Sequence, residues 1–351
     1  MKKNIAFVLP YIPVIPSGGV IIVFKYAEKL VNDGNDVSIY FKTDMVWNNK
    51  KIRLPRFLRR MVGKLGTAIS PKWYHLDKKI KKRDLFRQSD LKKHEIIVAT
   101  GIETVESVVR YSVKPVKKYY LIQDFENWGV EDEYVIDSYS AGLYNIVISK
   151  WLMEIVSKYS SNTVYIPDGI DTEVFWYNEK SQRVKHSIVF HYRSAAEKGC
   201  KYALEAITRL YKKYSDLKVT IISKEERVDT IPSWCEYRHN ITLEEVAEIN
   251  NKSEIFICSS INEGFGLPGL EAMACGCALC TTDYLGGKEY AVNQFNAMVS
   301  PVKDVEKLYQ NVVSLFENPE LKEKIVKNGL KTANDFSLEK SYIKLLKTFD
   351  I

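Results

Sequence analysis

The sequence lacks the features of a membrane-spanning or disordered protein. No apolar run approaches the roughly 18 residues that a transmembrane helix needs. A hydrophobic fraction of 46% with 12% aromatic residues is typical of a folded chain. The first residues, MKKNIAFVLP, resemble a signal peptide, but their apolar run, Ile5–Leu9, is shorter than the roughly 7–15 residues of such a signal. We therefore expect a first β-strand there and a cytoplasmic protein.

Cysteine is absent from the first 199 residues, and the six cysteines that follow do not have the spacing of a metal site. Cys275, Cys277 and Cys280 are close together, which could suggest zinc. No second pair stands at zinc-ligand spacing, however. Small buried cysteines are common in reducing compartments, and this is the interpretation that we prefer. We expect no bound metal.

A chain of 351 residues is long for one hydrophobic core and natural for two domains. Strand-like apolar runs alternate with helical patterns in both halves, which predicts parallel sheets with right-handed crossovers. The predicted strands are Ile5–Leu9, Val37–Phe41, Ile96–Thr100, Tyr119–Gln123, Ile146–Ser149, Ile188–Tyr192, Val219–Ser223, Ile255–Cys258 and Ala278–Thr282. The predicted helices include Val20–Asn32, Lys201–Tyr214, Leu243–Asn250, Val305–Glu317 and Pro319–Asn334.

The most informative segment is EGFGLPGLEAMACG, residues 263–276. It follows a predicted strand, and its proline suits the first turn of a helix, so the order is strand, loop, helix. Ligands of open α/β sheets bind at the carboxyl ends of strands, where this loop lies. Its glycines would let backbone N–H groups approach a ligand closely. Two carboxylates, Glu263 and Glu271, would accept hydrogen bonds from the vicinal diols of a sugar and a ribose.

This segment resembles the Glu-x7-Glu signature of family four glycosyltransferases. The resemblance implies an α/β chain of GT-B fold, with two doubly wound, Rossmann-like domains facing across a cleft. It implies that Glu263 faces the donor sugar and Glu271 the ribose. The residues implied to complete the donor site are Gly264, Phe265, Gly266 and Leu267. The alternative is a plain strand-to-helix turn whose acids cap and solubilise the helix.

The resemblance also implies a division of the chain into domains. Residues 1–166 would form the acceptor-side domain, and residues 167–335 the domain that binds the nucleotide sugar. Residues 336–351 would form a helix that crosses back to the first domain. The boundary falls at PDGID, residues 167–171, which is similar to the family's hinge segment.

Two further segments could bind a diphosphate. Arg193 and Lys198, in RSAAEK after a predicted strand, are similar to the family's Arg-x4-Lys segment at the donor pyrophosphate. Cations there would stabilise the leaving group more strongly as the glycosidic bond breaks. Gly18 and Gly19, after the first strand, would let amides and a helix N-terminus face the diphosphate. A solvated basic loop and an ordinary strand-to-helix turn are the alternatives, and the nucleobase is expected near Ser223.

The segment QDFENW, residues 123–128, follows the fourth predicted strand. Many family members have a histidine in this neighbourhood, where this chain has Asp124. Asp124 or Glu126 could bind or help activate an acceptor hydroxyl, with a helix cap or a buried hydrogen bond as the alternative. Trp128 could stack on a sugar or could belong to the core. The string QDFE is similar to rhamnosyltransferases of bacterial surface glycans.

Charge is distributed unevenly along the chain. Residues 50–94 contain 16 Lys and Arg against three Asp, a net charge of +13, whereas the whole chain carries +7. Within Leu54–Leu65, apolar and basic residues alternate at helical spacing, which is typical of an interfacial membrane helix. We expect an anionic membrane surface as the partner, because the family's acceptors are often lipid-linked. Nucleic acid is the disfavoured target, and a solvated loop is the third interpretation.

The residues and the resemblance together predict a metal-independent, retaining glycosyltransferase without a cofactor. It would move a hexose or deoxyhexose from a nucleoside-diphosphate sugar to a growing bacterial surface glycan or lipid-linked acceptor. No Asp-x-Asp metal motif is present, so lysine, arginine and backbone dipoles would stabilise the diphosphate. The enzyme would lie in the cytoplasm, on the inner face of the cell membrane. The alternatives are a catalytically silent GT-B subunit and another GT-B enzyme, such as a sugar-nucleotide epimerase.

Overall fold

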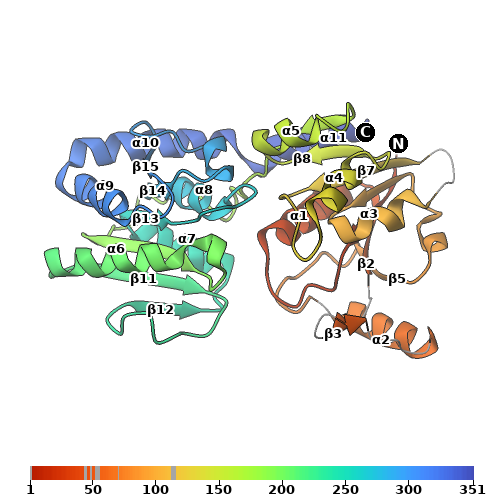
Figure 1. Cartoon of the computed structure of the whole chain (residues 1–351), viewed down its shortest axis with the longest axis horizontal. Helices are drawn as coiled ribbons and strands as arrows, with labels where there is room; N and C mark the ends of the chain where they lie inside the picture. The colour runs from red at the N-terminus through yellow and green to blue at the C-terminus, as the bar shows by residue number, and fades with distance from the viewer. Residues whose placement is uncertain (1, 43–45, 48–49, 52–55, 70, 112–115) are drawn as a thin grey trace. The chain divides into compact units, whose positions relative to one another are not determined.

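The computed structural model describes residues 2–42, 46–47, 50–51, 56–69, 71–111 and 116–351. The chain divides into two compact units (Figure 1). The first unit contains Met1–Pro167 and Tyr342–Ile351, and the second contains Asp168–Ser341. The acceptor-side and donor-side roles of the two halves of the chain remain predictions.

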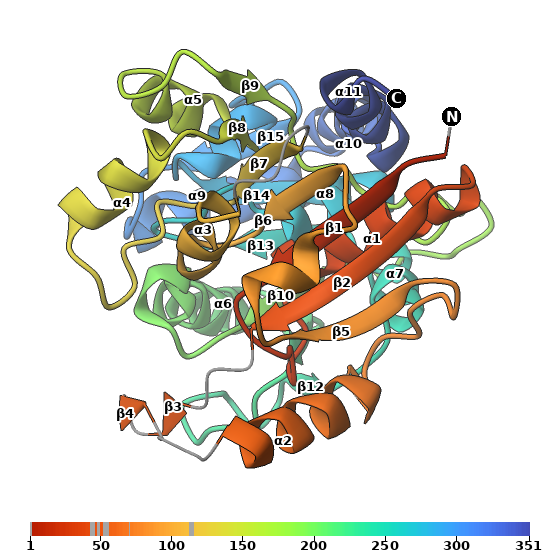
Figure 2. The ribbon, with the colours of Figure 1, turned by 90° about the vertical axis from the view of Figure 1, so that its right-hand side faces the viewer.

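The described part of the first unit is built on a parallel sheet in the order β5-β2-β1-β6-β7-β8-β9. Its strands are β1 (Asn4–Leu9), β2 (Asp36–Lys42), β5 (Lys81–Leu85), β6 (Ile96–Ala99), β7 (Lys117–Ile122), β8 (Tyr144–Val147) and β9 (Thr163–Tyr165). Its helices are α1 (Gly18–Asn32), α2 (Arg56–Ile69), α3 (Ile102–Val109), α4 (Asp132–Tyr139) and α5 (Lys150–Val156). Two short strands, β3 (Val46–Trp47) and β4 (Lys50–Lys51), pair antiparallel outside this sheet (Figure 2).

The second unit is described throughout and contains a parallel sheet in the order β12-β11-β10-β13-β14-β15. Its strands are β10 (Ser187–Tyr192), β11 (Lys218–Ser223), β12 (Glu236–His239), β13 (Ile255–Cys258), β14 (Ala278–Thr282) and β15 (Ala297–Ser300). Its helices are α6 (Cys200–Lys213), α7 (Leu243–Lys252), α8 (Leu267–Ala274), α9 (Val305–Glu317) and α10 (Pro319–Asp335). The last helix, α11 (Leu338–Phe349), begins in the second unit and ends in the first.

Apolar patterning explains both sheets. The central strands β1, β10 and β13 are almost continuously apolar and buried, as expected for parallel strands that are covered on both faces. The order of strands reverses between β1 and β6 in the first sheet, and between β10 and β13 in the second. Loops that leave the carboxyl ends of strands at such a switch point form the usual ligand site of this architecture. The fold is therefore the α/β GT-B arrangement of two doubly wound sheets that the sequence predicted.

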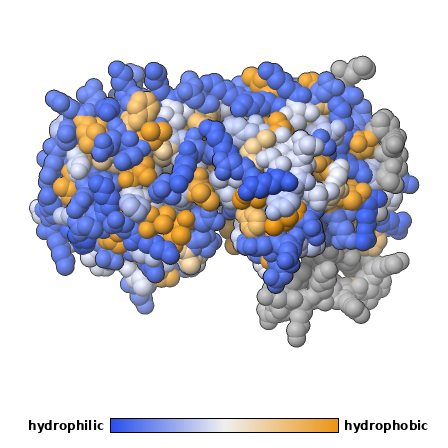
Figure 3. Space-filling view, turned by 45° about the horizontal axis from the view of Figure 1, so that its top comes forward, coloured by the Kyte–Doolittle hydropathy of each residue, from blue (hydrophilic) through white to orange (hydrophobic). Residues whose placement is uncertain are grey.

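Local capping defines the helix starts. The Ser17 hydroxyl accepts a hydrogen bond from the Val20 N–H at the first turn of α1. Thr242 and Glu245 form a reciprocal capping box at the start of α7. On the face drawn in Figure 3 the surface is largely hydrophilic, with small, separate hydrophobic groups. Within the described ranges, no helix has both the length and the apolar character to cross a membrane.

Candidate active site

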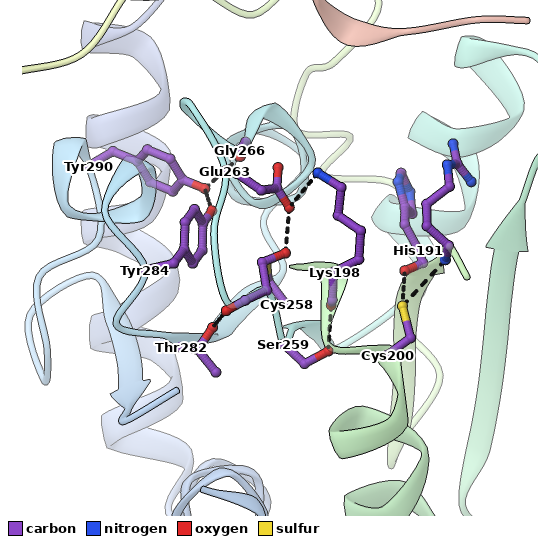
Figure 4. A network of polar contacts seen from close by, with 12 residues as sticks. His191, Lys198, Cys200, Cys258, Ser259, Glu263, Gly266, Thr282, Tyr284 and Tyr290 are labelled. Carbon is purple, nitrogen blue, oxygen red and sulfur yellow. Dashed lines mark hydrogen bonds and ion pairs between the residues drawn. The ribbon is translucent and has the colours of Figure 1, made fainter. Parts of the chain in front are cut away.

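The loops that follow β10 and β13 meet at the switch point of the second sheet (Figure 4). The Ile261 N–H donates to the Glu197 carbonyl over 2.7 Å. The Ser259 hydroxyl donates to the Lys198 carbonyl over 3.4 Å. Gly199 comes so close that a Cβ there would lie 2.1 Å from the Ser259 carbonyl oxygen. The two loops are therefore held directly against each other.

This contact brings Lys198 beside Glu263. The Lys198 ammonium lies 3.5 Å from Glu263 Oε1, and the Ser260 hydroxyl donates to the same oxygen. The Thr282 hydroxyl in turn donates to the Ser260 carbonyl, which ties this loop to β14. The Lys198 and Glu263 side chains are 33% and 17% exposed, so a ligand can reach both. A lysine held this loosely can turn toward an incoming anion as a mobile point charge.

Arg193 lies just beyond the end of β10 and is partly buried. One of its guanidinium N–H groups donates to the Tyr192 carbonyl over 2.9 Å, and its backbone N–H donates to the Cys200 thiol over 3.3 Å. Burial lowers the pKa of Arg193, and the negative Glu225 opposes that shift. An arginine remains charged at neutral pH in any case. The Glu225 carboxylate also accepts the Ser194 N–H over 2.9 Å, so a negative charge lies at this turn as well.

Ser223 does not present its side chain to this site. Ser223 is fully buried, and its hydroxyl donates to the Tyr192 carbonyl over 3.1 Å. The same hydroxyl accepts the Glu225 N–H over 2.9 Å. Ser223 was predicted to take part in donor binding, but its side chain instead stabilises this turn from within.

Glu271 lies in the second turn of α8 and is partly buried. Burial raises the pKa of the Glu271 carboxyl to about 7. In the part of the chain that the structure describes, burial is the one cause of this shift, and no hydrogen bond or charged partner opposes it. A carboxyl group in this state can still accept two hydrogen bonds from a vicinal diol.

The glycine-rich turn between the two acids is tightly built. Gly264, Phe265 and Gly266 are buried, and Leu267 is partly buried. Gly266 forms the N-cap of α8. Its φ of 93° and ψ of 53° are a left-handed backbone conformation that favours glycine. The Phe265 ring packs against Tyr290, with 5.8 Å between ring centroids. The turn therefore presents its backbone from a rigid base.

In the first unit, Gly18 and Gly19 begin α1 at the switch point of the sheet. A Cβ at Gly19 would lie 2.4 Å from the side-chain oxygen of Gln123, so glycine permits a close approach of two loops. Asp124 follows, and its carboxylate accepts the N–H of Phe125 over 2.8 Å. The glycine pair and Asp124 therefore follow two strands, β1 and β7, at the same edge of the sheet.

Glu126 and Trp128 differ in exposure. The Glu126 carboxylate is buried and accepts the Ile102 N–H at the start of α3 over 2.5 Å and the Tyr120 hydroxyl over 2.8 Å. Burial raises its pKa to about 7. This is the helix cap that the sequence left open as the alternative to acceptor binding. Trp128 is 68% exposed, which excludes the core position that the sequence also allowed.

The clustered cysteines are buried, as predicted. Cys275, Cys277 and Cys280 are at most 1% exposed and carry free thiols. Across the described ranges, no three His, Cys, Asp or Glu side chains gather as a candidate metal site. Metal independence remains a prediction.

The second unit is similar to a known protein family. Residues 178–332 match the family described as "Glycosyl transferases group 1". The chain is 24% identical, over 346 residues, to the poly(glycerol-phosphate) alpha-glucosyltransferase of Bacillus subtilis. That alignment covers 89% of this chain and 48% of the relative, so the chain spans about half the length of this curated relative.

Solved structures share the whole fold at low sequence identity. Sucrose-phosphate synthase from Thermosynechococcus elongatus has a TM-score of 0.75 at 16% identity, over 99% of this chain and 98% of that chain. Anabaena HepE in complex with UDP-glucose has a TM-score of 0.76 at 10% identity, over 99% of both chains. These two likenesses concern the fold alone.

Proposed function

Because residues 178–332 match the group 1 glycosyl transferases and the chain has the GT-B fold, we propose that this protein is a retaining glycosyltransferase. It moves a hexose or deoxyhexose from a nucleoside-diphosphate sugar to a growing surface glycan or lipid-linked acceptor. The observation that carries the proposal is the approach of Lys198 to within 3.5 Å of Glu263 at the switch point of the second sheet. The similar HepE structure contains UDP-glucose, which supports a nucleotide sugar as donor.

The proposed mechanism uses charges that this chain supplies. Arg193 and Lys198 bind the diphosphate. Glu263 accepts a hydrogen bond from a hydroxyl of the donor sugar, and Glu271 accepts hydrogen bonds from the ribose diol. The bond between the sugar and the phosphate oxygen breaks, and the acceptor oxygen bonds to the same carbon on the same face. The departing phosphate oxygen takes the proton of the acceptor hydroxyl. The attraction between these two cations and the phosphate grows as negative charge develops on that phosphate. The reaction in this proposal therefore proceeds without a metal.

The acceptor belongs at the loop after β7 in this proposal. Trp128 offers an exposed aromatic face for a sugar ring, and Asp124 offers a carboxylate for an acceptor hydroxyl. Glu126 acts there as a support, since it is committed to the N-terminus of α3. A catalytically silent subunit is disfavoured, because Arg193 and the Lys198–Glu263 pair keep an arrangement suited to a diphosphate.

A transfer assay tests the function. The protein is incubated in EDTA with UDP-, GDP- and dTDP-sugars and a glycan acceptor, and the anomeric configuration of the product is read by NMR. Transfer with retention is the expected result. Activity that disappears in EDTA and returns with magnesium or manganese would reject the metal-free mechanism, and sugar-nucleotide conversion without acceptor would indicate an epimerase.

Donor affinity is expected to depend on pH through Glu271. The pKa of this carboxyl is about 7, and its ionised form accepts ribose hydroxyls best. Affinity should therefore rise with pH, by about tenfold between pH 6 and pH 8 for a single titration centred at 7. Isothermal titration with an intact nucleotide sugar measures this, because its diphosphate diester has no ionisation near neutrality.

The variant Glu271→Gln is the control for this pH dependence. Its affinity should be weak and nearly independent of pH, since the amide does not titrate. An equal rise of affinity with pH in Glu271→Gln would assign the titration to another group and reject the ribose role.

The basic segment supports attachment to an anionic membrane. Residues 52–55, including Leu54, lie outside the described residues, as do the side chains of Arg56, Arg59 and Arg60. The observed helix is α2, Arg56–Ile69, which extends beyond the predicted Leu54–Leu65. Residues 81–85 of the same segment form the edge strand β5, so only part of residues 50–94 is helical.

Helix α2 packs on the unit through small residues. A Cβ on Gly63 would lie 2.5 Å from an Asp84 oxygen of β5, and Thr67 is buried. Three of its large apolar side chains are exposed instead, Met61 at 65%, Leu65 at 66% and Ile69 at 55%. Apolar insertion together with basic charge is the combination that holds an interfacial helix on anionic lipid.

Changing the outward apolar side chains is expected to release the protein from membranes. Met61→Ser, Leu65→Ser and Ile69→Ser combined should reduce binding to vesicles of phosphatidylglycerol and phosphatidylcholine by about tenfold or more in a sedimentation assay. Transfer to a short soluble acceptor should persist. The matched control is Val292→Ser with Phe295→Ser, which removes exposed apolar side chains from the second unit. Equal vesicle binding by both variants and the unaltered protein would refute the membrane role.

A further inference from the structure

Two tyrosines lie buried beneath the glycine-rich turn of the donor site (Figure 4). Tyr284 and Tyr290 are 1% and 2% exposed, and both come from the segment that joins β14 to β15. Their hydroxyl oxygens are 3.1 Å apart, and the Tyr290 hydroxyl donates to the carbonyl of Gly266 over 2.6 Å. Since Tyr290 uses its proton on Gly266, the Tyr284 hydroxyl donates to Tyr290. The hydrogen bonds form a relay from Tyr284 through Tyr290 to Gly266.

The burial of two hydroxyl groups here is not explained by packing alone. Phenylalanine would fill the same space without bringing a polar group into the interior, where an unbonded hydroxyl is costly. Burial also raises the pKa of both tyrosines well above the usual value, so the hydroxyls stay protonated donors at any working pH. The relay therefore supplies a constant hydrogen bond to one backbone carbonyl.

That carbonyl determines how the turn faces a ligand. Gly266 has a left-handed backbone, and its carbonyl shares a peptide plane with the N–H of Leu267 at the start of α8. A Cβ on Gly266 would lie 2.0 Å from the Tyr284 hydroxyl oxygen, so the ring presses directly on the turn. Rotation of this peptide would turn its N–H as well as its carbonyl.

The same segment holds the turn at its other end. Gly286 packs its backbone on the carbonyl of Glu263 and on the N–H of Phe265, where a Cβ would lie 2.6 and 2.7 Å away. The segment from Tyr284 to Tyr290 therefore contacts the turn at Glu263 and again at Gly266. Among the described residues, the Glu263 side chain is held by Ser260 and more loosely by Lys198.

We propose that Tyr284 and Tyr290 are positioning residues, whose hydroxyl relay orients the Glu263–Gly266 turn for the transfer step. The inference rests on the proposed function for its catalytic meaning. Diphosphate and ribose are bound in that scheme by Arg193, Lys198 and Glu271. The turn faces the sugar, whose geometry matters most as the bond breaks, so a loosened turn slows transfer more than it weakens nucleotide binding.

Tyr290→Phe removes the hydrogen bond and keeps the ring that packs against Phe265 and Phe336. Hydrogen–deuterium exchange of the peptide covering residues 263–270 should become faster by about tenfold, the effect of losing one hydrogen bond. The turnover number should fall by a similar factor. Affinity for the matching nucleoside diphosphate should stay within about twofold. Tyr284→Phe should have a smaller effect, because Tyr290 still reaches Gly266.

Tyr214→Phe is the matched control. It removes a tyrosine hydroxyl that donates to Glu317 over 3.0 Å in the same unit, away from the turn. Its exchange in residues 263–270 and its turnover should equal those of the unaltered protein. Unchanged exchange of that peptide in Tyr290→Phe overturns the proposal, as does a loss of affinity equal to the loss of turnover.

The exchange measurement needs no donor and separates two kinds of failure. Faster exchange in Tyr290→Phe, in a protein that transfers no sugar from UDP-, GDP- or dTDP-sugars, would support the relay and reject the proposed function. Normal exchange in an active enzyme would reject the relay alone.

Discussion

Lys198→Ala is expected to lower the turnover number by about 100- to 1000-fold, the usual effect of removing one group that stabilises developing charge. The Lys198 ammonium lies 3.5 Å from Glu263 and is 33% exposed, so it can move onto a diphosphate when a donor binds. Negative charge on the departing phosphate grows as the bond breaks, and a point charge gains most at that moment. Affinity for the nucleoside diphosphate should fall much less. Steady-state kinetics and titration calorimetry separate the two quantities.

Lys201→Ala is the matched control for this substitution. Lys201 lies three residues further along the chain, is exposed and has its ammonium 5.0 Å from the centroid of the Tyr202 ring. Its removal should leave turnover unchanged. Arg193→Ala should resemble Lys198→Ala, because Arg193 follows the same strand and is proposed to hold the same diphosphate. Equal losses of turnover and affinity in Lys198→Ala would mean that the lysine binds ground state and transition state alike.

Local sequence patterns predicted most of the fold, because buried parallel strands are nearly continuous apolar runs. All nine predicted strands are present, with small shifts of their ends. The described strands that the patterns missed are β3, β4, β5, β9, β12 and β15. β12 has the sequence EYRH and β5 has the sequence KKRDL, and both lie at sheet edges, where a strand need not be apolar. Neither the alternation of apolar residues nor the overall apolar content of the sequence indicates such strands.

The site was predictable only where its residues are neighbours in sequence. The strand, loop and helix around Glu263 followed from glycine, proline and carboxylate spacing. The contact of Lys198 with Glu263 joins loops from two strands, and only the strand order brings them together. The Tyr284–Tyr290 relay was missed for the same reason, since nothing in the local sequence around the two tyrosines indicates which turn they support. The nucleobase was expected near Ser223, but the side chain of Ser223 faces inward and donates to the Tyr192 carbonyl, an orientation that the sequence did not indicate.

Gly199→Ala is expected to damage stability and catalysis together. Gly199 has a φ of 58°, and a Cβ there would lie 2.1 Å from the Ser259 carbonyl oxygen, which belongs to backbone and cannot rotate away. The two loops must separate, which strains the hydrogen bond between Ile261 and Glu197. We expect the free energy of unfolding to fall by about 2–4 kcal/mol, the range for substitutions that combine backbone strain with overpacking.

Gly34→Ala isolates the backbone contribution to that loss. Gly34 has a φ of 88° and no atom within 4 Å of the position of a Cβ, so alanine there meets strain without collision. It should cost only about 1 kcal/mol and leave turnover unchanged. In Gly199→Ala, by contrast, separation of the loops moves Lys198 away from Glu263, and a displacement near 1 Å can cost about 100-fold in rate. Chemical denaturation and turnover of both variants give the comparison. Equal destabilisation by the two substitutions, with full activity in Gly199→Ala, would mean that the contact between the loops does not hold the catalytic cations in place.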